Sequence, residues 1–497
     1  MISPFVVLIV IAVYFGVLIL IARLTSKNST NDDFFIGNRQ SPWYVVAFGM
    51  IGATLSGVTF ISVPGWVGDS HFSYLQMIIG YVFGYLVIAY VLMPTYYRLR
   101  LTSIYGYLDQ RFGGYSYKTG ASFFLLSRTI GASFRLFLVA IVLQQFLMDP
   151  LGVPFWITVA LTIGLIWIYT TKGGIKTIIW TDTIQTAAIL TVLISIIMKI
   201  SNYFDWSFTE MISQVRHSEY SQVFYFEGGW SDPNNFWKQF LAGMFITIVM
   251  TGLDQDMMQK NLSINTLRNA QKNMNTFNVI LFFVVSLFLV LGALLYIYAE
   301  AIGVGVPGRM VGGVSVPSTD LLFPELAMNH LGPVVGVLFL IGLIAAAYSS
   351  ADSALTSLTT SFCIDILGFE KKELTEKRKT TTRQKVHVGF SLLLFLTIQV
   401  FWWINNDAVI SSLFKVAGYT YGPLLGLYTF GFFTTREVRD RLVPLVCILA
   451  PILSYILNAN SEKWMNGYQF GFEILLVNGL FTVLGLWIIS KPRKSVQ

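Results

Sequence analysis

Charged residues interrupt the apolar segments of this chain at four places. Asp182, Arg128, Arg135 and Asp352 each lie in a stretch that is otherwise hydrophobic. A charge at bilayer depth costs about 2.5–3.5 kcal/mol on insertion scales, so such residues face a protein interior, an ion or a water-filled path. Carboxylates bind cations, and guanidinium groups bind carboxylates or phosphates through paired hydrogen bonds. The four residues therefore favour a transporter.

One face of segment 345–353 could bind a cation. Ser349, Asp352 and Ser353 stand at positions i, i+3 and i+4, and Ala346 lies one turn earlier on the same face. Hydroxyl, carboxylate and carbonyl oxygens suit a hard cation such as Na+. The alternative is that the serines bond to preceding carbonyls and serve helix packing. The carboxylate favours the ion, because an unpaired one is costly in a membrane.

Asp182 lies about two turns after Lys176 in a second apolar segment. It could be a cation ligand at membrane depth. The alternative is an acid that faces the cytoplasm and pairs with Lys176 or Lys172.

Arg128 and Arg135 are seven residues apart and share one helix face. One of them could bind an anionic solute while the other pairs internally with Asp182 or Asp352; alternatively, both are structural. For Asp254–Asp256, near the end of another apolar segment, we expect a structural or gating role.

The composition requires a membrane to position these residues. The chain has 497 residues, of which 55% are hydrophobic and 12% charged, whereas soluble domains average about 25% charged. Apolar windows of about 20 residues predict an all-α multi-pass membrane protein. The first window is expected to be a retained helix rather than a cleaved signal peptide. The thirteen predicted spans are 4–23, 41–68, 72–98, 117–148, 153–171, 174–199, 236–258, 269–300, 333–362, 386–404, 407–434, 441–459 and 469–490.

The positions of the basic residues predict how the chain is oriented in the membrane. Of the 33 lysines and arginines, 25 fall in alternate connections between the predicted spans. The positive-inside rule then predicts an outside amino terminus, a cytoplasmic carboxyl terminus and a place in the cell (inner) membrane. Topology thus explains the net charge of +7, and nucleic-acid binding is not expected. The basic connections are 23–39, 98–118, 172–176, 260–272, 371–385, 436–441 and 491–494.

The predicted spans fall into two sets of five within a single transporter domain, 1–497. The first set covers 41–199 and the second 236–434, with peripheral helices at 4–23 and at 441–490. Because five is odd, the second set enters the membrane from the opposite side. This is the topology of an inverted repeat, which places a binding site near the middle of the membrane.

Glycines indicate where a helix of each set is broken. The opening span of the first set contains Gly49, Gly52 and Gly57, and that of the second contains Gly243 and Gly252. Broken helices at corresponding positions of two repeats point to a binding site. The alternative is that these glycines only allow close helix packing.

Catalytic chemistry and cofactors are not expected. The two cysteines, Cys363 and Cys447, lie at or within apolar helices and form neither a CxxC motif nor a disulfide framework. A membrane-embedded enzyme would need a catalytic pair inside a helix, and the histidines are predicted to lie in or beside loops. We therefore predict that the chain is not an enzyme. The four histidines are His71, His217, His330 and His387.

Several separated motifs, in their order and spacing, resemble the solute:sodium symporter family, which shares a five-plus-five inverted-repeat fold. The likeness spans nearly the whole chain. It implies Na+ as the coupling ion and no other cofactor. The motifs are Asp33–Arg39, Tyr107–Gly113, Gly173-Gly174 through Asp182 and Gln185, Asp254-Gln255 with Gln259-Lys260, Ser349-Ser350, and Tyr421-Gly422-Pro423 with Gly431.

The resemblance implies two cation sites. Ligands of the first would be the backbone carbonyls of Gly52, Leu55 and Ala346 with the hydroxyls of Ser349 and Ser350. The second, present in some members, would use Asp182, Ser349, Asp352 and Ser353. Here Asp352 stands where the family has a serine. Its extra charge could tighten the ion site, admit a proton, or be neutralised by Arg128.

The resemblance also implies a solute site. Thr54, Ser56 and Thr59 resemble hydroxyls of the sialic acid transporter branch that contact solute. Arg135 matches the arginine that binds the solute carboxylate there, and Gln76 is a weaker candidate. The paired aromatic residues of the glucose and galactose branch are absent, which lowers the expectation of a neutral sugar.

We therefore predict a sodium-coupled symporter that imports a small polar solute bearing a carboxylate, similar to a sialic acid. The alternative is a Na+-coupled symporter of a neutral sugar, polyol or amino acid. The expected partners are the solute, Na+ and the lipid bilayer; no oligomeric state is predicted.

Overall fold

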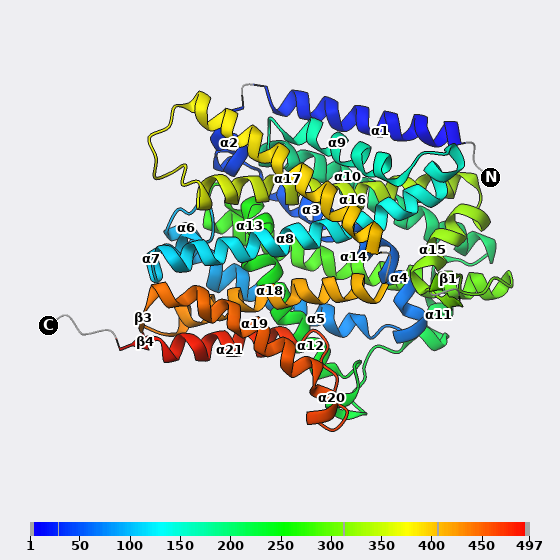
Figure 1. Ribbon diagram of the computed structural model, residues 1–497. Helices are drawn as coiled ribbons and strands as arrows, with labels where there is room; N and C mark the ends of the chain where they lie inside the picture. The colour runs from blue at the N-terminus through cyan, green and yellow to red at the C-terminus, as the bar shows by residue number, and fades with distance from the viewer. Residues whose placement is uncertain (1–3, 28, 312–313, 405–406, 493–497) are drawn as a thin grey trace.

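Long helices lying side by side make up most of the structure, a computed structural model that describes residues 4–27, 29–311, 314–404 and 407–492. In Figure 1, α1 (Pro4–Thr25) runs along one edge of the bundle and α21 (Ile474–Ile488) along the opposite edge. The chain begins at one end of the bundle and finishes at the other. The predicted helical membrane-protein class agrees with this arrangement.

The first part of the chain, up to residue 203, is helical apart from short turns. Two of its long helices carry three of the four charged residues that the sequence singles out: α8 carries Arg128 and Arg135, and α10 carries Asp182. After α1, the elements are α2 (Asn31–Ile36), η1 (Gly37–Arg39), α3 (Trp43–Thr54), α4 (Gly57–Ser70), α5 (Tyr74–Val87), η2 (Ile88–Leu92), α6 (Met93–Arg98), α7 (Gly106–Arg111), α8 (Gly114–Leu143), η3 (Gln144–Met148), η4 (Asp149–Leu151), α9 (Phe155–Thr170) and α10 (Ile175–Tyr203).

The second part of the chain adds further long helices and two short antiparallel strand pairs. Among the helices, α16 carries the serine and aspartate cluster. The elements are α11 (Phe208–His217), η5 (Glu219–Ser221), η6 (Gly229–Ser231), α12 (Phe236–Thr247), η7 (Ile248–Gly252), α13 (Gln255–Leu262), α14 (Leu267–Ala301), β1 (Gly308–Val311), β2 (Val314–Pro317), η8 (Thr319–Leu321), α15 (Leu322–Glu325), η9 (Leu326–His330), α16 (Pro333–Ser361), η10 (Phe362–Ile366), α17 (Glu376–Ile404), α18 (Asp407–Phe433), β3 (Glu437–Val438), η11 (Asp440–Leu442), α19 (Val443–Ala459), α20 (Ser461–Trp464), α21 and β4 (Ser490–Lys491).

Two helix pairs are sharply bent, and they are the opening spans of the two predicted sets. The axes of α3 and α4 differ by 57°, and those of the α12–η7 segment and α13 by 63°. The prediction that glycines mark broken helices at these two places is confirmed. Both breaks leave backbone groups outside the helical ladder, where other groups must bind them.

Seven of the described helices are long and apolar enough to cross a membrane, and the two bent pairs raise this number to nine. Three shorter apolar helices, Ile9–Thr25, Phe155–Thr170 and Ile474–Ile488, lie within other predicted spans. A multi-pass helical membrane protein is therefore confirmed, whereas the count of thirteen spans stays a prediction.

The chain also contains two small antiparallel sheets, which the all-α prediction missed. Strands β1 and β2 pair with Gly308 opposite Pro317, and β3 pairs with β4 across the ends of two helical segments. The strands lie outside the apolar helices, and β4 follows the last of them, where hydropathy gives no signal for such short strands.

The position of His387 contradicts the prediction that every histidine lies in or beside a loop. Helix α17 begins at Glu376, earlier than predicted, and His387 is fully buried within it. Its ring nitrogens lie 2.9 Å from the hydroxyls of Thr170 and Thr359. The two threonines satisfy the ring, so His387 joins α9, α16 and α17 as a structural residue.

Helix α3 packs closely on α10 because glycines remove side chains from the contact. A methyl group at Gly52 would lie 2.4 Å from Thr186 Oγ1, and one at Gly49 would lie 3.1 Å from Asp182 Cβ. The Gly52 amide also donates to Thr186 Oγ1 at 2.9 Å. This close approach brings the broken helix beside the carboxylate of Asp182.

The Gly52→Ala substitution is expected to lower the free energy of unfolding by about 1–3 kcal/mol, because overpacking a tight contact costs that much. Denaturant unfolding of the purified protein in detergent measures it. The Thr186→Ala change should recover part of the loss by removing the clashing hydroxyl. Gly16→Ala is the matched control, since a methyl group there meets nothing within 4 Å. A Gly52→Ala protein as stable as this control would contradict the packing argument.

Candidate functional site

The break between α3 and α4 frees carbonyl groups from the helical ladder, among them those of Gly52 and Leu55. In a continuous helix the amides of Ser56 and Thr59 would donate to the carbonyls of Gly52 and Leu55. Instead, the Ser56 amide donates to the Thr54 carbonyl at 2.9 Å, and the Thr59 amide donates to Ser56 Oγ at 3.4 Å. The carbonyls of Gly52 and Leu55, which are predicted to bind Na+, are thus among those that lose their helical donors at the break.

Tyrosine hydroxyls bind the carbonyls that are freed at the second break, between η7 and α13. Tyr96 donates its hydroxyl to the Gly252 carbonyl at 2.9 Å, and Tyr105 donates to the Leu253 carbonyl at 3.1 Å. Both hydroxyls are buried. The carbonyls freed here are therefore already hydrogen-bonded, whereas the first break keeps Gly52 and Leu55 outside the helical ladder.

The serines of α16 meet the first break and Asp182. Ser349 and Ser350 are buried, and Ser349 donates its hydroxyl to Asp182 Oδ1 at 2.6 Å. A methyl group at Gly57, the first residue of α4, would lie 3.8 Å from Ala347. Helices α3, α4, α10 and α16 thus converge around one cluster of oxygen atoms.

Lys260, not Lys176 or Lys172, is the partner of Asp182. Its ammonium donates to Asp182 Oδ2 at 2.6 Å, and both side chains are buried with about 1% exposure. The prediction that Lys260 belongs to the connection 260–272 is wrong. The residue lies in α13, beyond the second break, where a polar helix enters the protein interior.

Lys176 pairs instead with Asp33, at 3.1 Å. Burial raises the pKa of Asp33, but hydrogen bonds from Thr30 and the charge of Lys176 outweigh it, so its pKa lies below the usual value. Asp33 also closes a capping box with Thr30 at the start of α2. This pair holds α2 against the first turn of α10.

Asp352 is buried without an ion pair among the described residues. Its Oδ2 accepts a hydrogen bond from the Tyr169 hydroxyl at 2.8 Å, while Oδ1 has no partner. Arg128 does not neutralise it, so that predicted alternative is wrong. Ser353 is also buried in α16, and its hydroxyl has no hydrogen-bond partner among the described residues. Of the predicted second group of ligands, Ser349 contacts Asp182, whose other oxygen is bound by Lys260; the second cation site stays a prediction.

Arg128 pairs with Asp256 of α13, and both are buried. The predicted pairing of an arginine with Asp182 or Asp352 is therefore wrong. Next to this pair, Tyr421 of α18 donates to Asp254 Oδ2 at 2.7 Å. The structural role expected for Asp254–Asp256 agrees with these bonds, which join α8, α13 and α18.

Arg135 has no carboxylate partner within the described part of the chain. Its guanidinium donates to Ser350 Oγ at 3.2 Å. One turn further along α8, Val139 lies 2.3 Å from the point where a methyl group on Gly57 would be. Arg135 is thus an unpaired cation at the predicted Na+ ligands and near the first break.

The hydroxyls predicted to contact solute surround the same break. Thr54 donates to the Met50 carbonyl at 2.8 Å, and the hydroxyls of Ser56 and Thr59 lie 3.3 Å apart. Thr54 and Thr59 are partly exposed, whereas Ser56 is buried. Each of these hydroxyl oxygens keeps a lone pair for a further hydrogen bond.

Gln76 lies apart from this group. Its amide donates to the carbonyls of Ser73 and Asn234 and accepts a bond from the Tyr225 amide. The side chain is fully buried and fixes the connection that precedes α12. A solute contact would require it to exchange one of these bonds.

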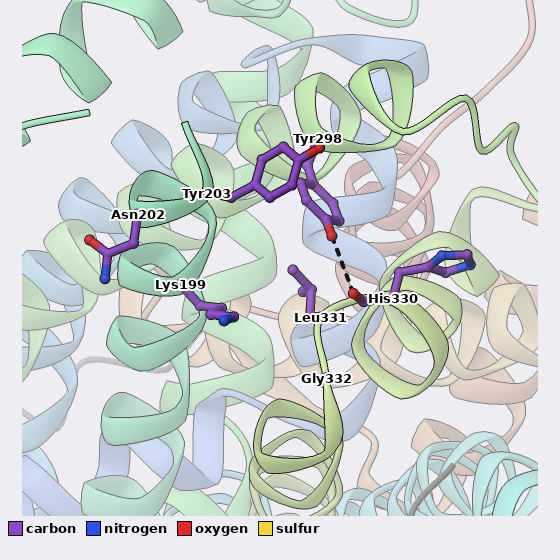
Figure 2. Close-up of a pocket in the computed structure, with 7 residues that line it drawn as sticks. All are labelled: Lys199, Asn202, Tyr203, Tyr298, His330, Leu331 and Gly332. Atoms are coloured by element: carbon purple, nitrogen blue, oxygen red, sulfur yellow. Dashed lines mark hydrogen bonds between the residues drawn. The ribbon is translucent and has the colours of Figure 1, made fainter. Parts of the chain in front are cut away.

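A surface cavity of about 340 Å³ lies elsewhere, where α10 and α14 end and α16 begins. Figure 2 shows its lining and the hydrogen bond from the Tyr298 hydroxyl to the His330 carbonyl. No predicted site residue lines it. The lining residues are Lys199, Asn202, Tyr203, Tyr298, His330, Leu331 and Gly332.

Sequence reasoning missed Lys260 and Tyr169. Lys260 follows Asp256 by four residues, so on a helix both would share one face. That spacing could have indicated that Lys260 points inward if α13 had been recognised as a helix. Tyr169 carries no comparable signal, because tyrosines are common near the ends of membrane helices.

Comparison with known proteins gives consistent matches. A model of the Sodium:solute symporter family matches residues 34–439. The chain is 26% identical to the sodium/sialic acid symporter NanT of Aliivibrio fischeri over 86% of this chain and 83% of that protein. It is 24% identical to the sodium/sialic acid symporter SiaT of Proteus mirabilis over 92% of this chain and 90% of that protein.

A solved structure of a Na+-coupled sialic acid symporter superposes with a TM-score of 0.82. The superposition covers 98% of this chain and 99% of that one, with 21% identical residues. This likeness establishes that the two chains share a fold.

Proposed function

Because the chain belongs to the Sodium:solute symporter family, we propose that it imports a small acidic solute of the sialic acid type together with Na+. The observation that carries this proposal is Arg135, a cation that has no carboxylate partner among the described residues and that touches Ser350. A guanidinium forms a fork that fits a carboxylate. The relatives named for sialic acid agree with such a solute.

We assign the first Na+ site to the break of α3–α4 and the facing turn of α16. The Ser349 hydroxyl donates a hydrogen bond to Asp182. The lone pairs of its oxygen are therefore free to bind a cation. The carbonyls of Gly52 and Leu55 have lost their helical donors, and a carbonyl keeps a second lone pair even inside a helix. The proposed ligands are Gly52, Leu55, Ala346, Ser349 and Ser350.

Arg135 couples the two sites in this proposal. While no solute is bound, its positive charge lies on Ser350, a proposed Na+ ligand, and repels the ion. A solute carboxylate would draw the guanidinium away and neutralise it, which raises Na+ affinity. By linkage, Na+ then raises solute affinity by the same factor. Thr54, Ser56 and Thr59 would bind the hydroxyls of the solute.

Alanine at Ser349 or Ser350 is expected to raise the Na+ concentration for half-maximal uptake about 10- to 100-fold, because a lost bond to a charged group is worth about 1.5–3 kcal/mol. Initial uptake rates in proteoliposomes over a range of Na+ concentrations measure it. Ser357→Ala is the matched control, since this buried serine of α16 bonds to the Ala354 carbonyl. Equal Na+ dependence in all three variants would contradict the assigned ligands.

The membrane arrangement also remains part of the proposal. We place thirteen spans in one domain, with the sets 41–199 and 236–434 as inverted repeats and the amino terminus outside. The bent opening helix of each set supports this arrangement. The chain also begins and finishes at opposite ends of the bundle, as an odd number of crossings requires (Figure 1).

Uptake into proteoliposomes tests the function. An inward Na+ gradient should drive accumulation of sialic acid, and an equal K+ gradient should not. Glucose and a neutral amino acid are tested in the same vesicles. Accumulation of a neutral solute, with none of sialic acid, would favour the neutral-solute alternative. Uptake that is indifferent to Na+ would overturn the proposal.

A further inference from the structure

A buried lysine occupies the position where a second cation would bind. Lys260 places its ammonium 2.6 Å from Asp182 Oδ2, and Ser349 donates to the other oxygen. An ammonium and a sodium ion carry the same charge, and both satisfy a buried carboxylate. Once Lys260 is in place, each carboxylate oxygen of Asp182 has a close positive or hydrogen-bonding partner.

The local charge supports this reading. Asp182 and Asp352 bring two carboxylates into the cluster, and Lys260 is the only basic residue paired with either among the described residues. Without the lysine, two buried acids would share the site, and a second bound cation would be needed to offset their repulsion. The lysine supplies that charge permanently.

The lysine reaches Asp182 because of the second break. Helix α13 turns by 63° from the segment before it and carries Asp256 and Lys260 on one face. Asp256 pairs with Arg128, while Gln259 donates to the Phe35 carbonyl at 2.6 Å. These bonds fix α13 in the interior. The ammonium of Lys260 is therefore held in contact with Asp182.

We propose that Lys260 is a tethered cation that replaces a second sodium ion at Asp182, so that this chain couples each solute to one Na+. The proposal rests on the proposed function, because it concerns the stoichiometry of the same transport cycle. The first Na+ site, at the break of α3–α4, is then the site that supplies the coupling ion. Asp182 binds the lysine instead of a mobile ion.

The Na+ dependence of initial uptake in proteoliposomes tests the proposal. The native protein is expected to give a Hill coefficient of about one, and Lys260→Gln a coefficient approaching two, because the vacated place then binds Na+. Lys260→Arg, which keeps the charge, should remain near one. The matched control is Lys238→Gln, which removes another buried lysine, one that pairs with Glu473 at 3.1 Å and lies outside the site; its coefficient should also remain near one.

A second measurement covers the case in which Lys260→Gln does not transport. Its melting temperature in detergent should fall in KCl and recover in NaCl by several degrees more than that of the native protein, since a ligand that binds only the folded state stabilises it. A native Hill coefficient near two overturns the proposal, and so does Lys260→Gln without any added Na+ stabilisation. Na+-independent uptake by the native protein would instead mean that the proposed function itself has failed.

Discussion

Replacing Arg135 with alanine is expected to weaken binding of an acidic solute at least about 30-fold, because truncating one partner of a buried charge pair costs about 2–5 kcal/mol. The guanidinium has no carboxylate partner within the described part of the chain. Its removal is therefore expected to lower the affinity for the solute directly. Titration of the purified protein with sialic acid in NaCl measures the affinity.

Arg135→Lys serves as the matched comparison. It keeps the charge but loses the planar fork, so an intermediate affinity is expected. If the natural solute is neutral, both variants should bind it within a few-fold of the native protein. That result would contradict the proposed carboxylate contact and favour a neutral sugar, polyol or amino acid.

The Arg128→Ala substitution is expected to lower the free energy of unfolding by about 3–5 kcal/mol, because it leaves the buried Asp256 without its partner. Denaturant unfolding in detergent measures the loss. The double change Arg128→Met with Asp256→Leu should lose much less, since it removes both charges and keeps the volume. Lys379→Ala breaks an exposed pair with Glu376 and should cost at most about 1 kcal/mol. An Arg128→Ala protein as stable as this control would contradict a structural role for the pair.

The broken helices could be predicted because glycines and the two sets of spans are visible in the sequence. The Na+ coupling and the family could also be predicted, since several separated motifs carry them. The matches with the family model and its relatives confirm both. The backbone carbonyls of Gly52 and Leu55 were predicted as Na+ ligands by resemblance alone. The amides of Ser56 and Thr59 donate elsewhere, which gives a physical reason why these two carbonyls can bind an ion.

The ion pairs could not be predicted in the same way. Hydropathy finds apolar windows, and the predicted span 236–258 stops inside the buried helix α13, so that Lys260 falls in the predicted connection 260–272. The partner of Asp182 therefore fell outside the predicted spans. Arg128 was matched to the wrong acids although Asp256 lies within a predicted span, because the turn of α13 brings Asp256 to Arg128. Which charges meet depends on how the second break turns the chain, and sequence spacing does not contain that angle.

The reciprocity of binding tests the central claim most directly. Solute affinity is titrated in NaCl and in KCl, and Na+ affinity is titrated with and without solute, all on the purified native protein. The proposed contact of Arg135 with both sites predicts the same factor in both directions, on the order of ten or more. A solute that binds equally well in Na+ and K+ would contradict the account.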